Sequence, residues 1–227
     1  METKLSRPKS LTDLAVERIR SAIVEGRLAI GAQISESALA AQFGISKTPV
    51  REALLRLKLD GLVEIHPQRG TFVFRLDDEE VAEICRFREI LESAALAEAM
   101  SRDRDALLGR LDANIRDMAR AHRSREARKL PQLDADFHGA ILELCGNAYL
   151  RAAYGLIEHK IHALRWRLPE DNDQVEHCQD NHAVIVEQIR EGNVGKAQTT
   201  LKRHIRETLD AYLEASHGAA LTERQSA

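Results

Sequence analysis

Three segments near the start of the chain carry apolar residues three or four positions apart, the spacing of one helix face. They predict a helix over residues 11–24, a short helix that Ser35 caps and that ends at Phe43, and a third helix capped by Ser46 or Thr48. Gly44 provides a tight turn between the second and third helices, and Pro49 is tolerated in a first helical turn. This order predicts a helix-turn-helix.

The pattern then changes to a period of two over residues 62–74. Residues alternate between two faces through LVEIH, the sequence PQRG supplies a turn, and TFVF is rich in residues that favour strands. A hairpin that follows three helices predicts a winged helix-turn-helix domain over residues 1–75.

From Leu76 onward the pattern is that of long helices alone. The predicted helices span residues 78–101, 104–127, 130–145, 147–168, 172–191 and 193–215. The last ten residues, GAALTERQSA, are expected to form a frayed tail. The predicted fold class is therefore mostly α, with a winged helix-turn-helix followed over residues 76–227 by an all-helical bundle of about six helices.

Composition argues against a membrane or secreted protein. Apolar residues make up 44% of the chain, enough to fill a core, but no apolar run approaches the roughly 18 residues that cross a bilayer. The opening METKLSRPKSLTDL lacks the apolar centre of a signal peptide, so we expect a cytoplasmic protein. Three widely spaced cysteines predict small core residues and no disulfide framework.

The net charge of −3 hides an asymmetry between the two predicted domains. Residues 1–75 hold 12 Lys and Arg against 8 Asp and Glu, a net +4, whereas residues 76–227 hold 21 against 28, a net −7. This division suits a polyanionic partner for the first domain.

The third helix concentrates basic residues at its start. Its apolar stripe must pack inward, which leaves Lys47, Thr48 and Arg51 exposed at the helix N-terminus. Backbone amides there favour phosphate, and Arg can contact guanine through two hydrogen bonds. Arg69 at the hairpin tip, beside the flexible Gly70, is placed to reach an adjacent groove or phosphate. The basic set is therefore predicted to contact double-stranded DNA; a solvated basic surface is the alternative.

Four polar residues share the apolar stripes of three bundle helices. Asp134 and His138 lie one helical turn apart, and His182 and His204 follow the apolar positions of the next two helices. One carboxylate and three neutral imidazoles suit a divalent transition metal, with zinc favoured over nickel, manganese or iron. The alternative for each histidine alone is a hydrogen-bonded core residue.

Two further residues are candidate contacts for a bound acid. The helix register of Arg88 points it inward, where its guanidinium fits either an effector carboxylate or an internal salt bridge. Asn147 follows Gly146 and is placed either to cap a helix or to contact a ligand.

The stretch SESALAAQFGISKTPVREALLRLKLDGLVEIHPQRGTFV resembles the N-terminal domain of GntR-family bacterial transcription regulators over residues 10–74. The resemblance implies a dimeric repressor or activator, with the five residues named above at the family's DNA-contact positions. Lys47, Ser37 and Ile30 depart from the usual Arg, Arg and Pro. Because Lys lacks the fork of Arg, base readout at position 47 is in doubt whereas phosphate contact is not.

Residues 78–215 are similar to the ligand-binding domain named for the fatty-acid regulator FadR, the FCD domain, in its shorter VanR-type branch. The DxxxH pair, the later histidines, REILE at residues 88–92 and FHxxIxxxCGN at residues 137–147 carry this resemblance. It implies a metal with open coordination positions facing a cavity, where a small carboxylate effector completes the shell.

We therefore expect a homodimeric transcription regulator, a repressor, whose affinity for a pseudo-palindromic operator is controlled by a small carboxylate at the metal site. One alternative is a regulator to which the metal itself is the signal. The other is a metal-dependent hydrolytic enzyme, because a His3Asp site can activate water.

Overall fold

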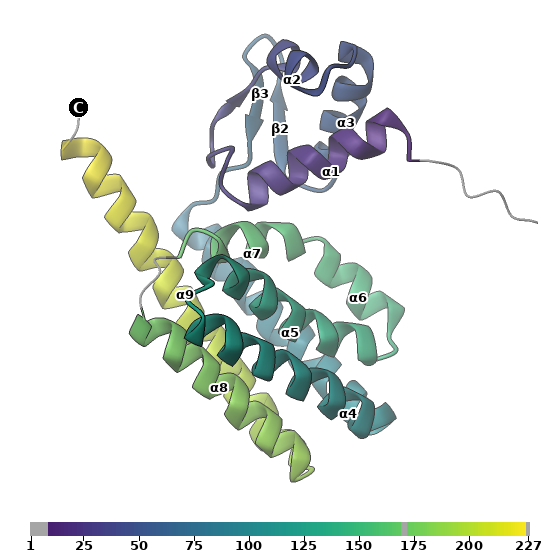
Figure 1. The fold of residues 1–227 in the computed structure, drawn as a ribbon, viewed down its shortest axis with the longest axis vertical. Coiled ribbons are helices and arrows are strands. Elements are labelled where there is room, and N and C mark those ends of the chain that lie inside the picture. Colours follow the sequence, from purple (N-terminus) through teal and green to yellow (C-terminus); the bar gives the residue numbers. More distant parts are fainter. Residues whose placement is uncertain (1–8, 169–171, 226–227) are drawn as a thin grey trace, which may run out of the picture. The chain divides into compact units, whose positions relative to one another are not determined.

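The computed structural model describes residues 9–168 and 172–225, which belong to two compact units that divide between Arg75 and Leu76 (Figure 1). This boundary is the one that the sequence predicts. Each unit has its own buried apolar core.

The N-terminal unit is a winged helix-turn-helix. Its elements are α1 (Leu11–Val24), β1 (Gln33–Ile34), α2 (Glu36–Phe43), α3 (Lys47–Leu59), β2 (Val63–His66) and β3 (Gly70–Val73). Ser35 caps α2, because its hydroxyl accepts a hydrogen bond from the Ala38 amide at 3.2 Å. Gly44 ends α2 in the left-handed conformation, with a φ of 66°, and so allows the turn into α3.

The wing is a three-stranded antiparallel sheet in the order β1-β3-β2. The hairpin of β2 and β3 confirms the sequence prediction. Strand β1 was missed because a two-residue strand is too short to show an alternation; it forms only by pairing with residues 71 and 72 of β3.

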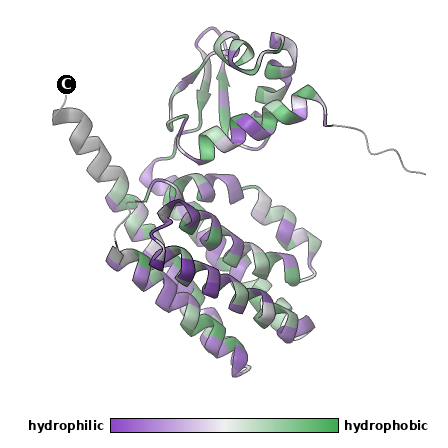
Figure 2. Ribbon diagram, in the orientation of Figure 1, coloured by the Kyte–Doolittle hydropathy of each residue, from purple (hydrophilic) through white to green (hydrophobic). Residues whose placement is uncertain are grey.

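The C-terminal unit is all helical in the described residues. Its elements are α4 (Asp78–Arg123), the short 3-10 helix η1 (Ala127–Lys129), α5 (Leu130–Leu144), α6 (Ala148–Gly155), α7 (Glu158–Arg165), α8 (Asn172–Arg190) and α9 (Val194–Gln225). Helix α4 packs against α5, α8 and α9. Hydrophobic and hydrophilic residues alternate along these helices, as expected of amphipathic helices around one core (Figure 2).

The break expected at residues 101–103 is present as a kink inside α4, where Asp103 has a non-helical φ of −158° and its side chain accepts from the Ala106 amide at 2.9 Å, which restarts the helix. Two other predicted boundaries are wrong. The single helix expected over residues 147–168 is divided into α6 and α7 after Gly155, a poor helix former. The tail expected to fray continues α9 to Gln225.

Two of the three cysteines are core residues, as predicted. Cys85 and Cys145 are buried, Cys178 is partly buried, and all three are free thiols. None of the described helices is long and apolar enough to cross a membrane.

Candidate functional site

The predicted DNA-contact residues of α3 are exposed together at its N-terminus. Val50, Ala53 and Leu54 turn inward and are at most 1% exposed, which leaves Lys47 and Thr48 on the outer face. Arg51 is 64% exposed and holds Glu36 of α2 in an ion pair of 3.0 Å. A pair this exposed is weak, so the guanidinium can exchange Glu36 for another acceptor.

The hairpin tip presents Arg69 and Gly70 to solvent. Gly70 has a φ of 111°, and a Cβ there would lie 2.9 Å from Nε2 of Gln33. That nitrogen donates to the carbonyl oxygen of Arg69 at 3.3 Å. Glycine at position 70 therefore allows the backbone conformation of the wing tip. Arg69 is the side chain at the tip that can contact a partner.

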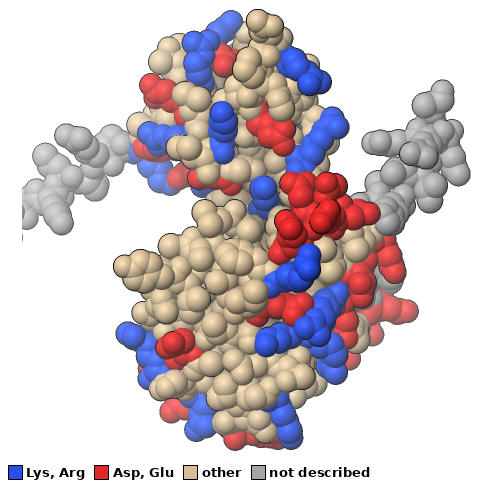
Figure 3. Space-filling view, turned by 180° about the vertical axis from the view of Figure 1, so that it is seen from behind, with Lys and Arg blue, Asp and Glu red and all other residues tan. Residues whose placement is uncertain are grey.

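Basic side chains of the N-terminal unit are interspersed with acidic ones on the face that Figure 3 shows. Arg56, for example, pairs with Asp13 at 2.7 Å, and Arg20 with Asp60 at 2.8 Å. Much of the positive charge of this unit is therefore paired with nearby acidic side chains. For contact with DNA, the basic residues at the start of α3 are more informative than the net charge of the unit.

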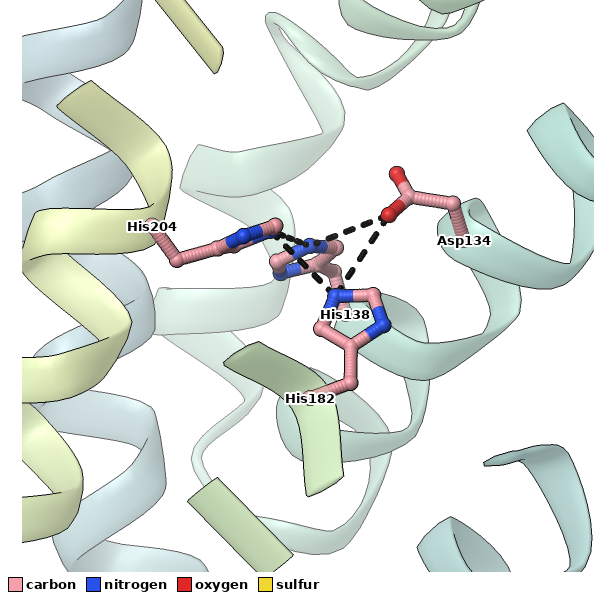
Figure 4. A group of neighbouring side chains, drawn as sticks. All are labelled: Asp134, His138, His182 and His204. Atoms are coloured by element: carbon pink, nitrogen blue, oxygen red, sulfur yellow. Dashed lines mark hydrogen bonds and ion pairs between the residues drawn. The ribbon is translucent and has the colours of Figure 1, made fainter. Parts of the chain in front are cut away.

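The four predicted metal ligands meet inside the helical unit (Figure 4). Asp134 and His138 come from α5, His182 from α8 and His204 from α9, and one ligand atom from each lies within 4.8 Å of all the others. Nε2 of His204 lies 3.2 Å from Nε2 of His182 and 3.3 Å from Nε2 of His138. Asp134 Oδ1 lies 3.5 Å from His182 Nε2 and 3.8 Å from His138 Nε2.

A second carboxylate orients His138 from behind. Glu92 Oε2 lies 2.6 Å from His138 Nδ1, and Glu92 Oε1 accepts from Arg88 Nε at 2.8 Å. All three side chains are 0% exposed. Because the carboxylate accepts the proton of Nδ1, the lone pair of Nε2 remains free toward the cluster.

Asp134 is held from the other side. Its Oδ2 forms an ion pair with Nε of Arg165 on α7, and the Cys178 thiol donates to its Oδ1 at 3.5 Å. Phe137 stacks on the ring of His182 with centroids 3.9 Å apart, which fixes the plane of that imidazole. The ligand-type atoms are thus positioned by side chains from α4, α5, α7 and α8.

The charges of the cluster suit a cation. Burial lowers the pKa of His182 to about 3 and lowers the pKa of His138 and of His204 as well, so the three imidazoles are neutral at pH 7. Burial alone would raise the pKa of Asp134, but Arg165 and the histidines outweigh it, and the net shift is downward. The cluster therefore offers a carboxylate and three neutral nitrogens.

The spacing of these atoms also fits a metal ion. Ligand atoms bound to one ion at about 2.0–2.1 Å lie about 3.3 Å apart in a tetrahedron and about 3.0 Å apart in an octahedron, where four protein ligands leave two positions open. The imidazole nitrogens lie 3.2 and 3.3 Å apart, and the Asp134 oxygen lies 3.5 and 3.8 Å from two of them. Hydrogen bonds between histidines account less well for the group, because the buried Nδ1 of His182 has no partner among the described residues.

A cavity of about 470 Å³ opens beside the cluster. Asp134, Arg165 and His204 line it, together with residues from the last turns of α4, the start of α5, the first half of α8 and the middle of α9. The cluster is thus accessible to a molecule the size of a metabolite.

The two predicted effector contacts have different surroundings. Arg88 points inward as predicted and forms the internal salt bridge, yet both of its Nη atoms lack a hydrogen-bond partner among the described residues. Asn147 caps α6, with its side-chain oxygen accepting from the amides of Tyr149 and Leu150, and it does not line the cavity. A contact between Asn147 and a ligand stays a prediction.

Sequence reasoning missed the roles of Glu92 and Arg165. The spacing of Arg88 and Glu92, four residues apart on one helix, was an available signal. Arg165 shares a helix face with Ile161 and Leu168, but charged residues are dense in that segment and hide the pattern.

Two family models match the chain. The model for bacterial regulatory proteins of the gntR family matches residues 11–73, and the FCD domain model matches residues 83–207. An HTH-type transcriptional regulator from an unstable DNA locus of Streptomyces ambofaciens is 30% identical over 194 residues, which are 85% of this chain and 81% of that protein. The gluconate operon transcriptional repressor of Bacillus licheniformis is 26% identical over 194 residues, 83% of this chain and 79% of that protein.

Solved structures show the same fold. A GntR transcriptional regulator from Rhodococcus sp. RHA1 superposes with a TM-score of 0.79 at 22% identity, covering 91% of this chain and 99% of that one. McbR/YncC of E. coli gives a TM-score of 0.79 at 20% identity with the same coverage.

Proposed function

Because this chain belongs to the GntR family of bacterial transcriptional regulators and carries an FCD domain, we propose that a small carboxylate bound at a metal site controls its affinity for operator DNA. The chain is a DNA-binding transcriptional regulator, and its curated relatives include operon repressors. We infer that it acts as a repressor and binds as a homodimer. Its family and relatives are regulators and not enzymes.

The convergence of Asp134, His138, His182 and His204 is the observation that carries the metal site. The set combines one carboxylate with three neutral imidazoles, and it has outer partners in Glu92 and Arg165. Zinc suits these ligands best, and nickel, manganese or iron are accepted by the same types of atom.

The adjoining cavity supports the organic effector. A metal that is held by protein side chains and keeps open coordination positions can bind a carboxylate directly. An acid in the cavity would lie beside Asp134 and His204, which line it. Arg88 and Asn147 remain the proposed effector contacts, the former because its Nη atoms have no hydrogen-bond partner in the part of the chain that the structure describes.

The proposed DNA contacts are Lys47, Thr48, Arg51, Arg69 and Gly70. The first three lie at the start of α3, where the helix dipole favours phosphate, and the last two form the wing tip. A homodimer would present two such surfaces to a pseudo-palindromic operator.

Metal analysis of the purified protein tests the proposal, run beside a variant that combines Asp134→Ala with His138→Ala. We expect about one metal ion per chain, lost in the variant together with the thermal stabilisation by small carboxylic acids. An acid that stabilises the metal-free variant as strongly as the wild type would remove the metal from the mechanism.

Operator binding measured with and without acid completes the test. A change of DNA affinity on metal addition alone, with no effect of any acid, would favour the metal as the signal. Sustained consumption of a bound acid would favour an enzyme.

A further inference from the structure

A group of buried hydrogen-bond donors lies beside the metal cluster. Neither Nη atom of Arg88 or of Arg165 has a hydrogen-bond partner among the described residues, and the same is true of the Tyr154 and Tyr212 hydroxyls. All four side chains are at most 4% exposed. Buried donors without acceptors are costly, so an acceptor is expected among them.

The two guanidinium groups are held in the same way. Arg88 uses Nε for Glu92, and Arg165 uses Nε for Asp134, so each keeps a fork of two Nη groups. A fork of this kind binds a carboxylate through two parallel hydrogen bonds. Glu92 contacts His138, and Asp134 belongs to the cluster, so both forks are anchored next to the cluster.

The donors form one electrostatic group although they come from α4, α6, α7 and α9. Arg88 and Arg165 interact with each other and with both tyrosines. Burial acts against the charge of each Arg, but Glu92 raises the pKa of Arg88 and Asp134 raises the pKa of Arg165. Both guanidinium groups therefore stay charged. The cavity meets this group at Arg165.

The balance of buried charge indicates what the acceptor is. The two guanidinium groups are matched by the carboxylates of Glu92 and Asp134, and the described buried residues include no other Asp or Glu. A divalent ion at the cluster adds two positive charges to this core. Because uncompensated charge is costly there, a dianion is favoured over a monoanion.

We propose a second anion site beside the metal cluster, which makes the effector a dicarboxylate. The site consists of Arg88, Tyr154, Arg165 and Tyr212. It receives one carboxylate while the other binds at the cluster. This inference rests on the proposed function and narrows its effector from any small acid to a diacid.

Calorimetric titration of the zinc-loaded, full-length protein tests the inference with matched acids. Diacids from malonate to adipate are compared with the monocarboxylic acids of equal chain length. At least one diacid should bind about tenfold or more tightly than its partner, because charge-assisted hydrogen bonds are gained at the second carboxylate.

The double variant Tyr154→Phe/Tyr212→Phe removes only the two unpartnered hydroxyls. It should weaken diacid binding about tenfold and leave monoacid binding unchanged. Tyr149→Phe is the matched control, because Tyr149 lies on the same helix as Tyr154 but is 88% exposed, and its variant should bind diacids as the wild type does.

Equal affinities for diacids and monoacids, or wild-type diacid binding by the double variant, would overturn the second anion site while the metal-bound acid of the proposed function stands. A zinc-loaded protein that binds no acid overturns both. Failure to retain zinc, seen in the metal content, removes the metal site independently of the acids.

Discussion

The buried series of contacts from Arg88 through Glu92 to His138 leads to a prediction about metal affinity. Glu92→Gln keeps the size of the side chain and removes its charge. Glu92 Oε2 now lies 2.6 Å from His138 Nδ1, and if the Gln oxygen takes that place, the Gln NH2 group faces the Nε–H of Arg88. Two donors then meet, and the hydrogen bond to Arg88 is lost. If the amide is reversed, it donates to Nδ1, and the imidazole proton moves to Nε2, where it blocks the lone pair that faces the cluster.

Either arrangement weakens the metal site. Loss of an outer carboxylate of this type lowers metal affinity about 10- to 100-fold, or about 1.4 to 2.7 kcal/mol. Competition between the protein and a chromophoric zinc chelator measures the change. Glu89→Gln is the matched control on the same helix, because Glu89 pairs with the exposed Arg206 at 2.7 Å and does not contact the cluster.

The variant also leaves Arg88 without a charged partner, so the metal-free protein should be less stable. Circular dichroism and thermal unfolding of the metal-free variant separate that loss from the loss of affinity, and Glu92→Asp offers a charged alternative if the Gln variant does not fold. A folded Glu92→Gln protein with zinc affinity within about twofold of wild type would refute the tautomer argument.

Three further outcomes are expected. Arg51→Ala should abolish sequence-specific operator binding while Arg56→Ala, on the same helix but paired with Asp13, weakens it little; a retained footprint in a protection assay would exclude Arg51 as a DNA contact. Between pH of about 6.5 and about 3 the unfolded chain binds protons on histidines that stay neutral in the metal-free folded state, because burial lowers the pKa of His182 to about 3. The free energy of unfolding should therefore fall as the pH falls through this window, and urea titrations at several pH values that show a flat profile would contradict it. Phe137→Ala should lower the free energy of unfolding by about 3–5 kcal/mol, because the ring is fully buried and stacked on His182; urea denaturation showing a loss below about 1 kcal/mol would mean that the core closes around the gap.

Helical periodicity was sufficient to predict that the residues of the His and Asp cluster face the core. His138, His182 and His204 each occupy a position in the apolar stripe of a different helix, and they are 0%, 0% and 2% exposed. A polar residue in such a stripe faces the core, where it needs a polar partner. Four such residues in one small bundle are therefore expected to contact each other. The same argument placed Arg88 inside.

The partners of those residues could not be predicted by the same means. Periodicity gives the direction of a side chain but not the helix that it meets, so the pairing of Arg165 with Asp134, which are far apart in sequence, depends on tertiary packing. Glu92 presents the same difficulty, because it lies in a helix with many surface charges. Strand β1 likewise depends on a partner strand that its own two residues do not indicate.

Helix α4 follows the DNA-binding unit in the chain and carries residues of the proposed effector site. It begins at Asp78, five residues after β3 of the wing ends at Val73, and carries Arg88 and Glu92 about three to four turns later. An acid that engages the Nη groups of Arg88, which no described residue contacts by a hydrogen bond, therefore acts on the first helix after the DNA-binding unit in the chain. Control of DNA affinity requires that the acid bind two states of the protein unequally, and the buried charge of Arg88 is a group through which that difference can arise.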